Sequence, residues 1–296
     1  MTVREQPPAS LPRFRHLRVP ASIRVFLHDP KAQVATIILL VVIFFAAFGP
    51  AIAPFGENEQ NLRASLEGPS WTHLLGTDQL GRDILSRAMY GSRVSVSVGL
   101  IVVAIAAAVA LPIGLSSGYF GGWVDAVLMR FVDTWISIPP IILILAIVAI
   151  AGTSLGNVML AIGLASFPVF SRLLRALTLS LKAQDFVTAA RSLGASDLRI
   201  LIRHILPNTV QPLIVQGTLL VGVAVLAEAA LSFLGFGAQP PQATWGNMIA
   251  EGFPVIRHSL WPTILPGALI MLFVLAANFM GDRLRDVLDP RLRGSL

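Results

Sequence analysis

The stretch Asp185-Phe-Val-Thr-Ala-Ala-Arg-Ser-Leu-Gly-Ala-Ser-Asp-Leu-Arg-Ile-Leu-Ile-Arg-His-Ile-Leu-Pro207 decides the fold, because it lies as a basic, amphipathic segment between two long apolar runs. Phe186, Ala190 and Leu193 recur at i, i+4 and i+7, which predicts one apolar stripe along a helix. Gly194 suits the position just after a helix, where the backbone turns left-handed. The pattern therefore predicts two short helices joined at Gly194.

The second of these helices has its own start and stop signals. Ser196 or Asp197 can cap its first turn, and a run of apolar residues then leads to Leu206-Pro207. Proline lacks a backbone donor and disfavours helix in the residue before it. Pro207 is therefore expected to mark a corner before the next membrane span.

The composition is that of an integral membrane protein. Hydrophobic residues make up 55% of the 296 positions, charged residues make up 13%, and the mean hydropathy is +0.75. A bilayer core of about 30 Å needs roughly 20 apolar residues per helix, and continuous apolar runs of that length exclude the alternating pattern of a membrane barrel. We expect an all-α membrane protein with six transmembrane helices, at about 33–55, 94–117, 127–151, 155–171, 209–233 and 261–281.

These spans divide the chain into an N-terminal segment, a six-span domain and a C-terminal tail. The first span follows a long basic leader, so we interpret it as an uncleaved anchor. The predicted segments are 1–32, the domain 33–281 with its loops 56–93, 172–208 and 234–260, and the tail 282–296.

Basic residues in the loops predict the orientation. With the N-terminus inside, segments 1–32, 172–208 and 282–296 hold 16 Lys and Arg, whereas the outer segments hold five. Both termini and the 185–207 stretch are therefore expected in the cytoplasm. The net charge of +6 is explained by this asymmetry, so nucleic-acid binding is not needed to account for it. The chain has no cysteine, which excludes disulfides and thiolate metal sites.

The sequence lacks the residues that several classes of enzyme require. A phosphate-binding loop needs Gly-Lys-Ser/Thr, yet the only lysines are Lys31 after Pro30 and Lys182 after Leu181. The histidines are scattered and form no metalloprotease motif. The string Gly114-Leu-Ser-Ser-Gly118 matches a nucleophile elbow by spacing, but it ends a helical span, so we interpret it as a chance match.

The 185–207 stretch resembles the cytoplasmic loop of ABC importer permeases. The family pattern is Glu-Ala-Ala, three residues, Gly, nine residues, Ile, one residue, Leu-Pro. The residues here that fall on it are Ala189, Ala190, Gly194, Leu206 and Pro207, while Thr188 replaces Glu and His204 replaces Ile.

A second stretch, Leu75-Gly-Thr-Asp-Gln-Leu-Gly-Arg-Asp-Ile-Leu-Ser-Arg-Ala-Met-Tyr-Gly-Ser-Arg93, resembles the hallmark of the C-type subunit in the dipeptide, oligopeptide and nickel branch of that family. Thr77 or Asp78 can cap a helix that begins near Gln79. Such a helix would lie at the outer interface and direct the chain into the second span, or it would contact substrate.

The resemblance implies a type I ABC importer permease fold with a cytoplasmic coupling helix. The residues it assigns to ATPase coupling are Asp185, Phe186, Thr188, Ala189, Ala190, Arg191, Leu193, Gly194, Ala195, Leu206 and Pro207. The alternative is that the helix pair lies on the inner membrane surface with its arginines facing lipid phosphates.

The resemblance also implies the partners. The chain would pair with a second, similar permease in a bacterial inner membrane, above two ATPase subunits that hold ATP and Mg²⁺, and it would receive cargo from an extracytoplasmic substrate-binding protein. The chain itself would bind no cofactor and no metal. Di- or oligopeptides are the expected cargo, with nickel chelates or glutathione as alternatives. The rival class is a self-sufficient, ion-coupled carrier.

Four residues in or near the spans are candidates for a functional or structural role. Glu228 interrupts the fifth span, where an ionised carboxylate costs roughly 2.5 to 3.5 kcal/mol; it is a candidate path or gate residue, or it lies near the outer end of its helix and pairs with the partner permease. Arg130 and Asp133 lie at i, i+3 and are expected to neutralise each other. Trp245, in the outer loop, is expected to be an interfacial aromatic anchor; the alternative is that Trp245 and Gly246 belong to a short re-entrant helix near a binding protein.

Overall fold

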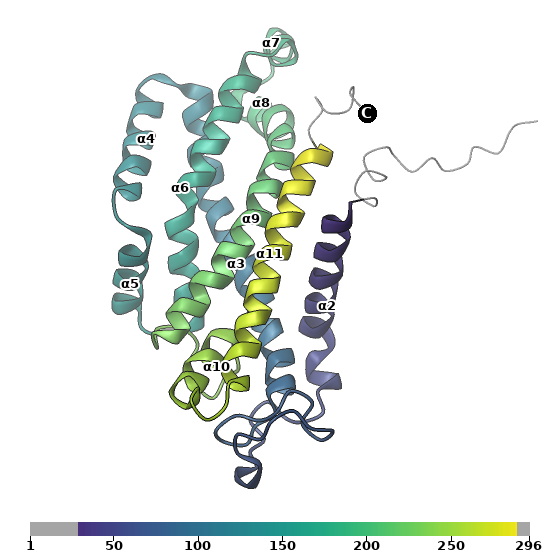
Figure 1. Ribbon diagram of the computed structural model, residues 1–296. Coiled ribbons are helices and arrows are strands. Elements are labelled where there is room, and N and C mark those ends of the chain that lie inside the picture. The colour runs from purple at the N-terminus through teal and green to yellow at the C-terminus, as the bar shows by residue number, and fades with distance from the viewer. Residues whose placement is uncertain (1–28, 289–296) are drawn as a thin grey trace, which may run out of the picture.

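The computed structural model describes residues 29–288 as a bundle of long helices with a shorter helix pair at one end (Figure 1). The helices are α2 (Pro30–Ile52), α3 (Ile84–Phe120), α4 (Gly122–Ile136), α5 (Pro140–Ala151), α6 (Leu155–Lys182), α7 (Asp185–Ser192), α8 (Asp197–Ile200), the π-helical turn η2 (Leu201–Ile205), α9 (Leu206–Phe233), α10 (Trp245–Gly252) and α11 (Trp261–Leu288).

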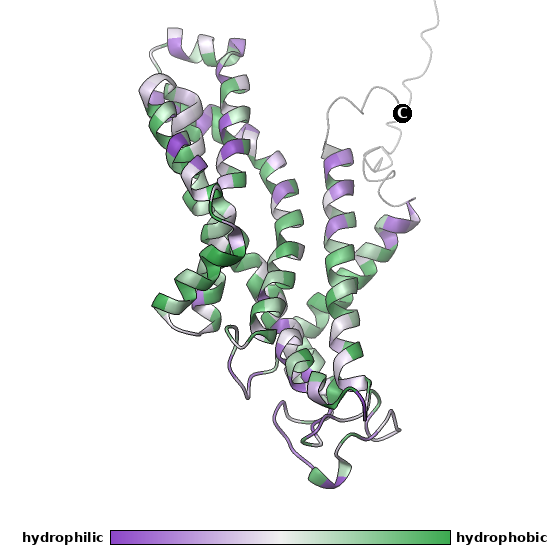
Figure 2. Ribbon diagram, turned by 60° about the vertical axis from the view of Figure 1, so that its left-hand side comes forward, coloured by the Kyte–Doolittle hydropathy of each residue, from purple (hydrophilic) through white to green (hydrophobic). Residues whose placement is uncertain are grey.

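The described residues contain five helices long and apolar enough to cross a membrane, and α4 with α5 makes a sixth span if that bent pair counts as one. Hydrophobic residues predominate along the middle of the long helices, whereas hydrophilic residues are more frequent toward the two ends of the bundle (Figure 2). The expected all-α fold with six spans is confirmed.

The third span departs from the predicted continuous helix 127–151. The chain bends by 88° between α4 and α5. Pro139 caps α5 and Pro140 is its first residue, so neither nitrogen can donate a bond back into α4. Residues that precede a proline also avoid helical backbone, which explains why α4 ends at Ile136.

The helix expected to begin near Gln79 begins later, at Ile84, as the first part of α3. The Asp78 carboxylate instead accepts hydrogen bonds from the backbone nitrogens of Leu80 and Arg82, at 2.9 and 3.0 Å, which holds a turn. Asp83 then caps α3 by accepting from the Ser86 nitrogen at 2.7 Å. The outer motif and the second span therefore share one helix of 37 residues, about 55 Å long.

Helices α3 and α6 approach each other closely at Gly114 and Gly118. A Cβ atom at Gly114 would lie 2.5 Å from the Leu174 Cβ, and one at Gly118 would lie 2.7 Å from the Arg175 carbonyl oxygen. Small residues four positions apart commonly let membrane helices pack tightly. The string that matched a nucleophile elbow is thus a helix-packing surface.

The start of α2 and the end of α11 lie at the same end of the bundle as α7 (Figure 1). Asp29 forms an ion pair with Arg283 that joins these two helix ends. The tail expected from residue 282 begins as helix, because α11 continues to Leu288. The rest of that tail, and segment 1–32 up to residue 28, lie outside the described residues.

Candidate ATPase-coupling site

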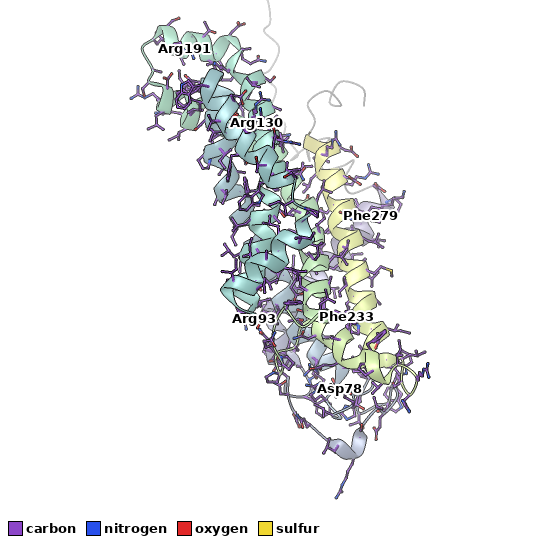
Figure 3. All side chains as sticks on the ribbon, turned by 90° about the vertical axis from the view of Figure 1, so that its left-hand side faces the viewer. Asp78, Arg93, Arg130, Arg191, Phe233 and Phe279 are labelled. Carbon is purple, nitrogen blue, oxygen red and sulfur yellow. The ribbon has the colours of Figure 1, made fainter. Side chains whose placement is uncertain are left out.

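Helix α7 projects beyond the bundle of spans (Figure 1), and its residue Arg191 lies at the opposite end of the molecule from Asp78 (Figure 3). The apolar stripe predicted on α7 is only partly correct. Val187 and Ala190 are buried against the rest of the protein, whereas Phe186 and Leu193 are 41% and 89% exposed. α7 therefore has two apolar faces, one packed inward and one exposed.

Gly194 ends α7 as predicted. Its φ is +81°, its nitrogen donates to the Arg191 carbonyl at 3.0 Å, and the Ala195 nitrogen donates to the Ala190 carbonyl at 3.1 Å. This is the Schellman arrangement, which satisfies carbonyls at a helix end. Ser196 then caps α8 by accepting from the Arg199 nitrogen, so the predicted second start is also confirmed.

The corner predicted at Pro207 is absent, because the helix continues through this residue. Residues Asp197 to Phe233 form one long helical segment in which η2 is a π turn, and the Leu206 nitrogen donates to the Leu201 carbonyl five residues back. Proline in a regular helix clashes with the carbonyl four residues earlier. A wider turn just before Pro207 leaves space for the ring, so the helix continues.

The predicted coupling residues divide by location. Leu206 and Pro207 begin α9, while the others belong to α7 and the turn after it. Most of the α7 group is exposed: Asp185, Phe186, Thr188, Ala189, Arg191, Leu193 and Gly194. Ala190 is buried and Ala195 is half-buried, so these two face the protein instead. The exposed group forms a continuous projecting surface, which we name the docking surface.

Glu228 lies near the C-terminal end of α9 and is fully buried. Its carboxylate accepts a hydrogen bond from the Ser232 hydroxyl at 2.6 Å, and the Ala238 nitrogen donates to that same hydroxyl at 3.3 Å. The Ser232 hydroxyl thus links the carboxyl group to the loop that follows α9 within the same chain.

The predicted pair between Arg130 and Asp133 is wrong. Asp133 instead pairs with Arg172 of α6 at 2.6 Å, and both side chains are about half exposed. A second link between the same helices, from both nitrogens of the Arg175 fork to the Asp125 carboxylate at 2.6 Å each, was not predicted. Pairs between distant helices leave no local spacing signal, so the sequence could indicate only the pair within one helix.

The expected interfacial position of Trp245 is also wrong. This residue begins α10 and is fully buried. Nearby, Arg82 and Arg87 both donate to the same oxygen of Glu251, at 2.5 and 3.0 Å, which ties α10 to the start of α3. The Leu75–Arg93 motif thus builds an internal, charged scaffold at the end of the bundle opposite to α7.

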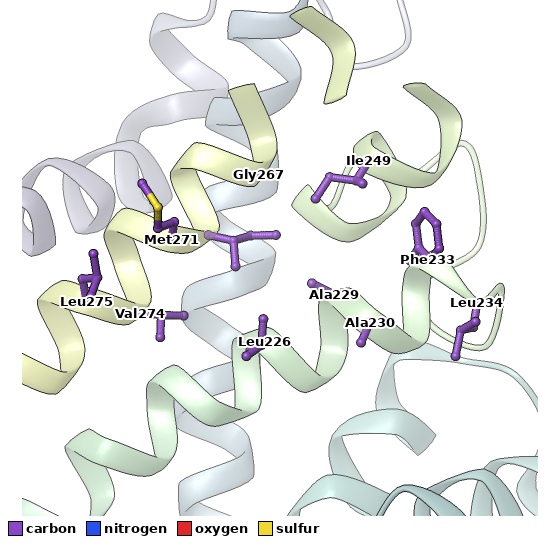
Figure 4. A pocket seen from close by; sticks show the side chains of 11 residues that line it. Leu226, Ala229, Ala230, Phe233, Leu234, Ile249, Gly267, Met271, Val274 and Leu275 are labelled. Atoms are coloured by element: carbon purple, nitrogen blue, oxygen red, sulfur yellow. The ribbon is translucent and has the colours of Figure 1, made fainter. Parts of the chain in front are cut away.

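A groove of about 720 Å³ lies between α9, α10 and α11 (Figure 4). Its walls are apolar, formed by residues that include Leu226, Ile249 and Met271. Such a surface has no group that would recognise the charged termini of a peptide, so it is not suited to hold a polar cargo.

Comparison with solved structures defines the class of protein. Two inward-facing structures of the MetNI methionine ABC transporter share the fold, with TM-scores of 0.53 and 0.55 and identities of 19% and 20%. They cover 67% and 69% of this chain, and 94% and 96% of their own. The fold is therefore that of a type I ABC importer permease.

Sequence comparison gives the family. Residues 110–294 match the binding-protein-dependent transport system inner membrane component family, and residues 21–69 match the N-terminal TM domain of oligopeptide transport permease C. The chain belongs to the binding-protein-dependent transport system inner membrane component family. It is a multi-pass permease subunit of an ABC importer and not an enzyme.

Curated relatives agree along most of the chain. The dipeptide transport system permease protein DppC of Alkalihalophilus pseudofirmus is 43% identical, covering 88% of this chain and 86% of that protein. DppC of Haemophilus influenzae is 42% identical, covering 90% and 93%. The glutathione transport system permease protein GsiD of Escherichia coli is also 42% identical, covering 92% and 90%. ATPase and substrate-binding partners follow from membership of such a family.

Proposed function

We propose that this chain forms half of the translocation path for di- or oligopeptides and docks to ATPase subunits through the docking surface. The observation that carries the docking role is the exposed apolar pair Phe186 and Leu193 on a short helix outside the spans. A helix on the membrane surface would turn such residues toward lipid. Here α7 projects beyond the bundle, where a protein groove is the better partner (Figure 3).

The assembly we propose contains this chain, a second similar permease, two ATPase subunits and an extracytoplasmic substrate-binding protein. ATP and Mg²⁺ bind to the ATPase subunits, because neither lysine of this chain belongs to a phosphate-binding loop. ATP binding brings the ATPases together and moves α7, which opens the path outward. Hydrolysis resets the path inward.

Both termini are proposed to lie in the cytoplasm. The start of α2 and the C-terminal end of α11 lie at the α7 end of the bundle (Figure 1). In the sequence, segments 1–32, 172–208 and 282–296 hold the excess of basic residues. This orientation places the docking surface where ATPases are available and the 56–93 loop where a substrate-binding protein delivers cargo.

Peptides are the proposed cargo because DppC relatives match the chain throughout, and glutathione, the cargo named for GsiD, is itself a short peptide. Nickel chelates are the alternative. Uptake of a labelled dipeptide by the reconstituted complex, with unlabelled dipeptide, glutathione or a nickel chelate as competitor, distinguishes them. Uptake of a labelled nickel chelate without any uptake of the labelled dipeptide would overturn the peptide assignment.

Replacement of Gly194 tests the docking role. At φ +81° a β-branched residue costs about 1 to 2 kcal/mol, whereas asparagine tolerates this backbone. Gly194→Val is expected to insert normally but to lose peptide uptake and ATPase binding, and Gly194→Asn is expected to retain both.

Gly235, which has φ +83° and open space around it at the outer end of α9, supplies the matched control. Gly235→Val carries the same backbone strain away from the docking surface and should still bind the ATPases. Full uptake by Gly194→Val would count against docking and would favour the self-sufficient carrier.

A further inference from the structure

Tyr119 is the next-to-last residue of α3 and lies beneath both helices of the docking region, only 3% exposed. Its hydroxyl donates to the Asp197 carboxylate in the first turn of α8 at 2.6 Å. The same hydroxyl accepts from the Arg191 guanidinium of α7 at 3.2 Å. One phenol oxygen therefore links the end of a membrane span to both short helices.

The ring and backbone of Tyr119 make further contacts. The Lys182 ammonium donates to the Tyr119 carbonyl and lies 5.5 Å from the ring centroid, while the Arg191 guanidinium lies 5.8 Å from it. Cations at this distance are attracted to an aromatic face. The hydrogen bond with Tyr119 also raises the pKa of Arg191, and an arginine side chain is in any case charged at physiological pH. Two cations, one from α6 and one from α7, thus contact the Tyr119 ring.

Tyr119 also joins the apolar core under the docking surface. That core contains Val187 and Ala190 of α7 together with Ile200, Leu201 and Ile205, and Tyr119 is its fully buried member from α3. Below it, α3 is closely packed on α6 through Gly114 and Gly118. If α7 moves, it therefore pushes on Tyr119, which belongs to the closely packed helix pair α3 and α6.

We propose that Tyr119 is a positioning residue that ties the docking surface to α3, so that movement of α7 reaches the second span directly as well as through α9. The inference rests on the proposed docking role and deepens it. The phenol contacts neither cargo nor nucleotide: it acts by keeping α7, α8 and α3 in one rigid body. Without the hydroxyl, α7 can shift while α3 stays behind.

Tyr119→Phe tests this tie, because it removes the hydroxyl and keeps the ring in the apolar core. Loss of a hydrogen bond to charged groups is expected to lower two activities of the reconstituted complex by about tenfold. These are peptide uptake and the ATP hydrolysis that the substrate-binding protein stimulates. Asp197→Leu should reproduce the defect. Asp197→Asn should largely restore uptake, since an amide oxygen still accepts from the phenol.

The control is the other tyrosine of the chain, at the opposite end of the same helix. Tyr90 makes only a long contact of 3.5 Å from its hydroxyl to the Pro50 carbonyl. Tyr90→Phe makes the same chemical change and should leave uptake and stimulated hydrolysis unchanged. An equal loss in both variants would overturn the proposal.

A distance measurement separates coupling from a general loss of fold. The chain has no cysteine, so Ser192→Cys on α7 and Ala108→Cys on α3 can carry spin labels without background. With the native Tyr119 the distance between labels should stay narrow with and without ATP. In the Tyr119→Phe variant the distribution should broaden when ATP binds. An unchanged, narrow distribution in that variant would overturn the tie.

The two proposals fail in different ways. If Gly194→Val abolishes uptake and Tyr119→Phe leaves it intact, docking is correct and the tie through Tyr119 is wrong. If both variants transport normally, the docking role itself is wrong.

Discussion

The indole nitrogen of Trp245 donates a hydrogen bond to the backbone carbonyl of Ala88, with 3.1 Å between the two atoms. The ring packs edge-on against Phe273 of α11, at 5.9 Å between centroids. Gly91 leaves room for it, since a Cβ atom there would lie 3.0 Å from the indole. One side chain thus fastens the outer helix α10 to both α3 and α11.

Replacement of Trp245 is expected to destabilise the outer end strongly. Truncation of a fully buried tryptophan costs about 3 to 5 kcal/mol. Trp245→Ala should therefore lower the thermal unfolding temperature of the purified chain in detergent. Trp71, which is 98% exposed, provides the control, and Trp71→Ala should leave the temperature unchanged. Equal temperatures for both variants would contradict the anchoring role.

Removal of Arg87 should cost more than removal of Arg172. The Arg87 side chain is 1% exposed and pairs with Glu251, so its loss leaves the partly buried Glu251 carboxylate with Arg82 as its remaining charged partner, at about 1 to 3 kcal/mol. The Arg172 side chain is 53% exposed, and its pair with Asp133 is worth at most about 1 kcal/mol. Chemical denaturation of Arg87→Leu and Arg172→Leu measures the difference. A larger effect for Arg172→Leu would refute the ranking.

Gly114→Ala is expected to separate α3 from α6. The new methyl group would press on backbone and Cβ atoms that cannot move cheaply, at a cost of about 1 to 3 kcal/mol. Gly156 lies on α6 and has open space around it, so Gly156→Ala should be neutral or stabilise the helix by up to about 1 kcal/mol. Unfolding temperatures that move together would show that the close approach is unimportant.

Glu228→Gln distinguishes a structural carboxyl group from a gate. An amide oxygen can accept the Ser232 hydroxyl as well as a carboxylate can, so the variant should fold and transport within about twofold of the native protein. Peptide uptake and unfolding temperature are the two measurements. Lost uptake at unchanged stability would instead support the path or gate hypothesis.

Local chemistry explains which features could be predicted from sequence. Gly194 and Ser196 act on their own helix ends, and the long apolar runs identify five spans directly. Pro139 and Pro140 break the third span locally, whereas the size of the bend depends on how α4 and α5 pack on α6. The helix expected near Gln79 starts only at Ile84, because the Asp78 carboxylate holds the preceding backbone in a turn.

Side chains that meet across helices were beyond sequence reasoning. Tyr119 and Asp197 are 78 positions apart, and Arg175 and Asp125 are 50 apart. No periodicity connects such residues, because the contacts depend on how the helices are placed in space. The rarity of tyrosine in this chain was the one sequence signal that could have drawn attention to Tyr119.

The π turn at Leu201–Ile205 holds one residue more than a regular helical turn would need. Each residue of an α-helix turns the next by about 100°, so this extra residue resets the angular phase between α8 and α9. A deletion of one residue here would regularise the helix and rotate every side chain of α9 by about that angle relative to the docking surface. The length of this turn therefore decides which side of α9 packs against α3, α6 and α11.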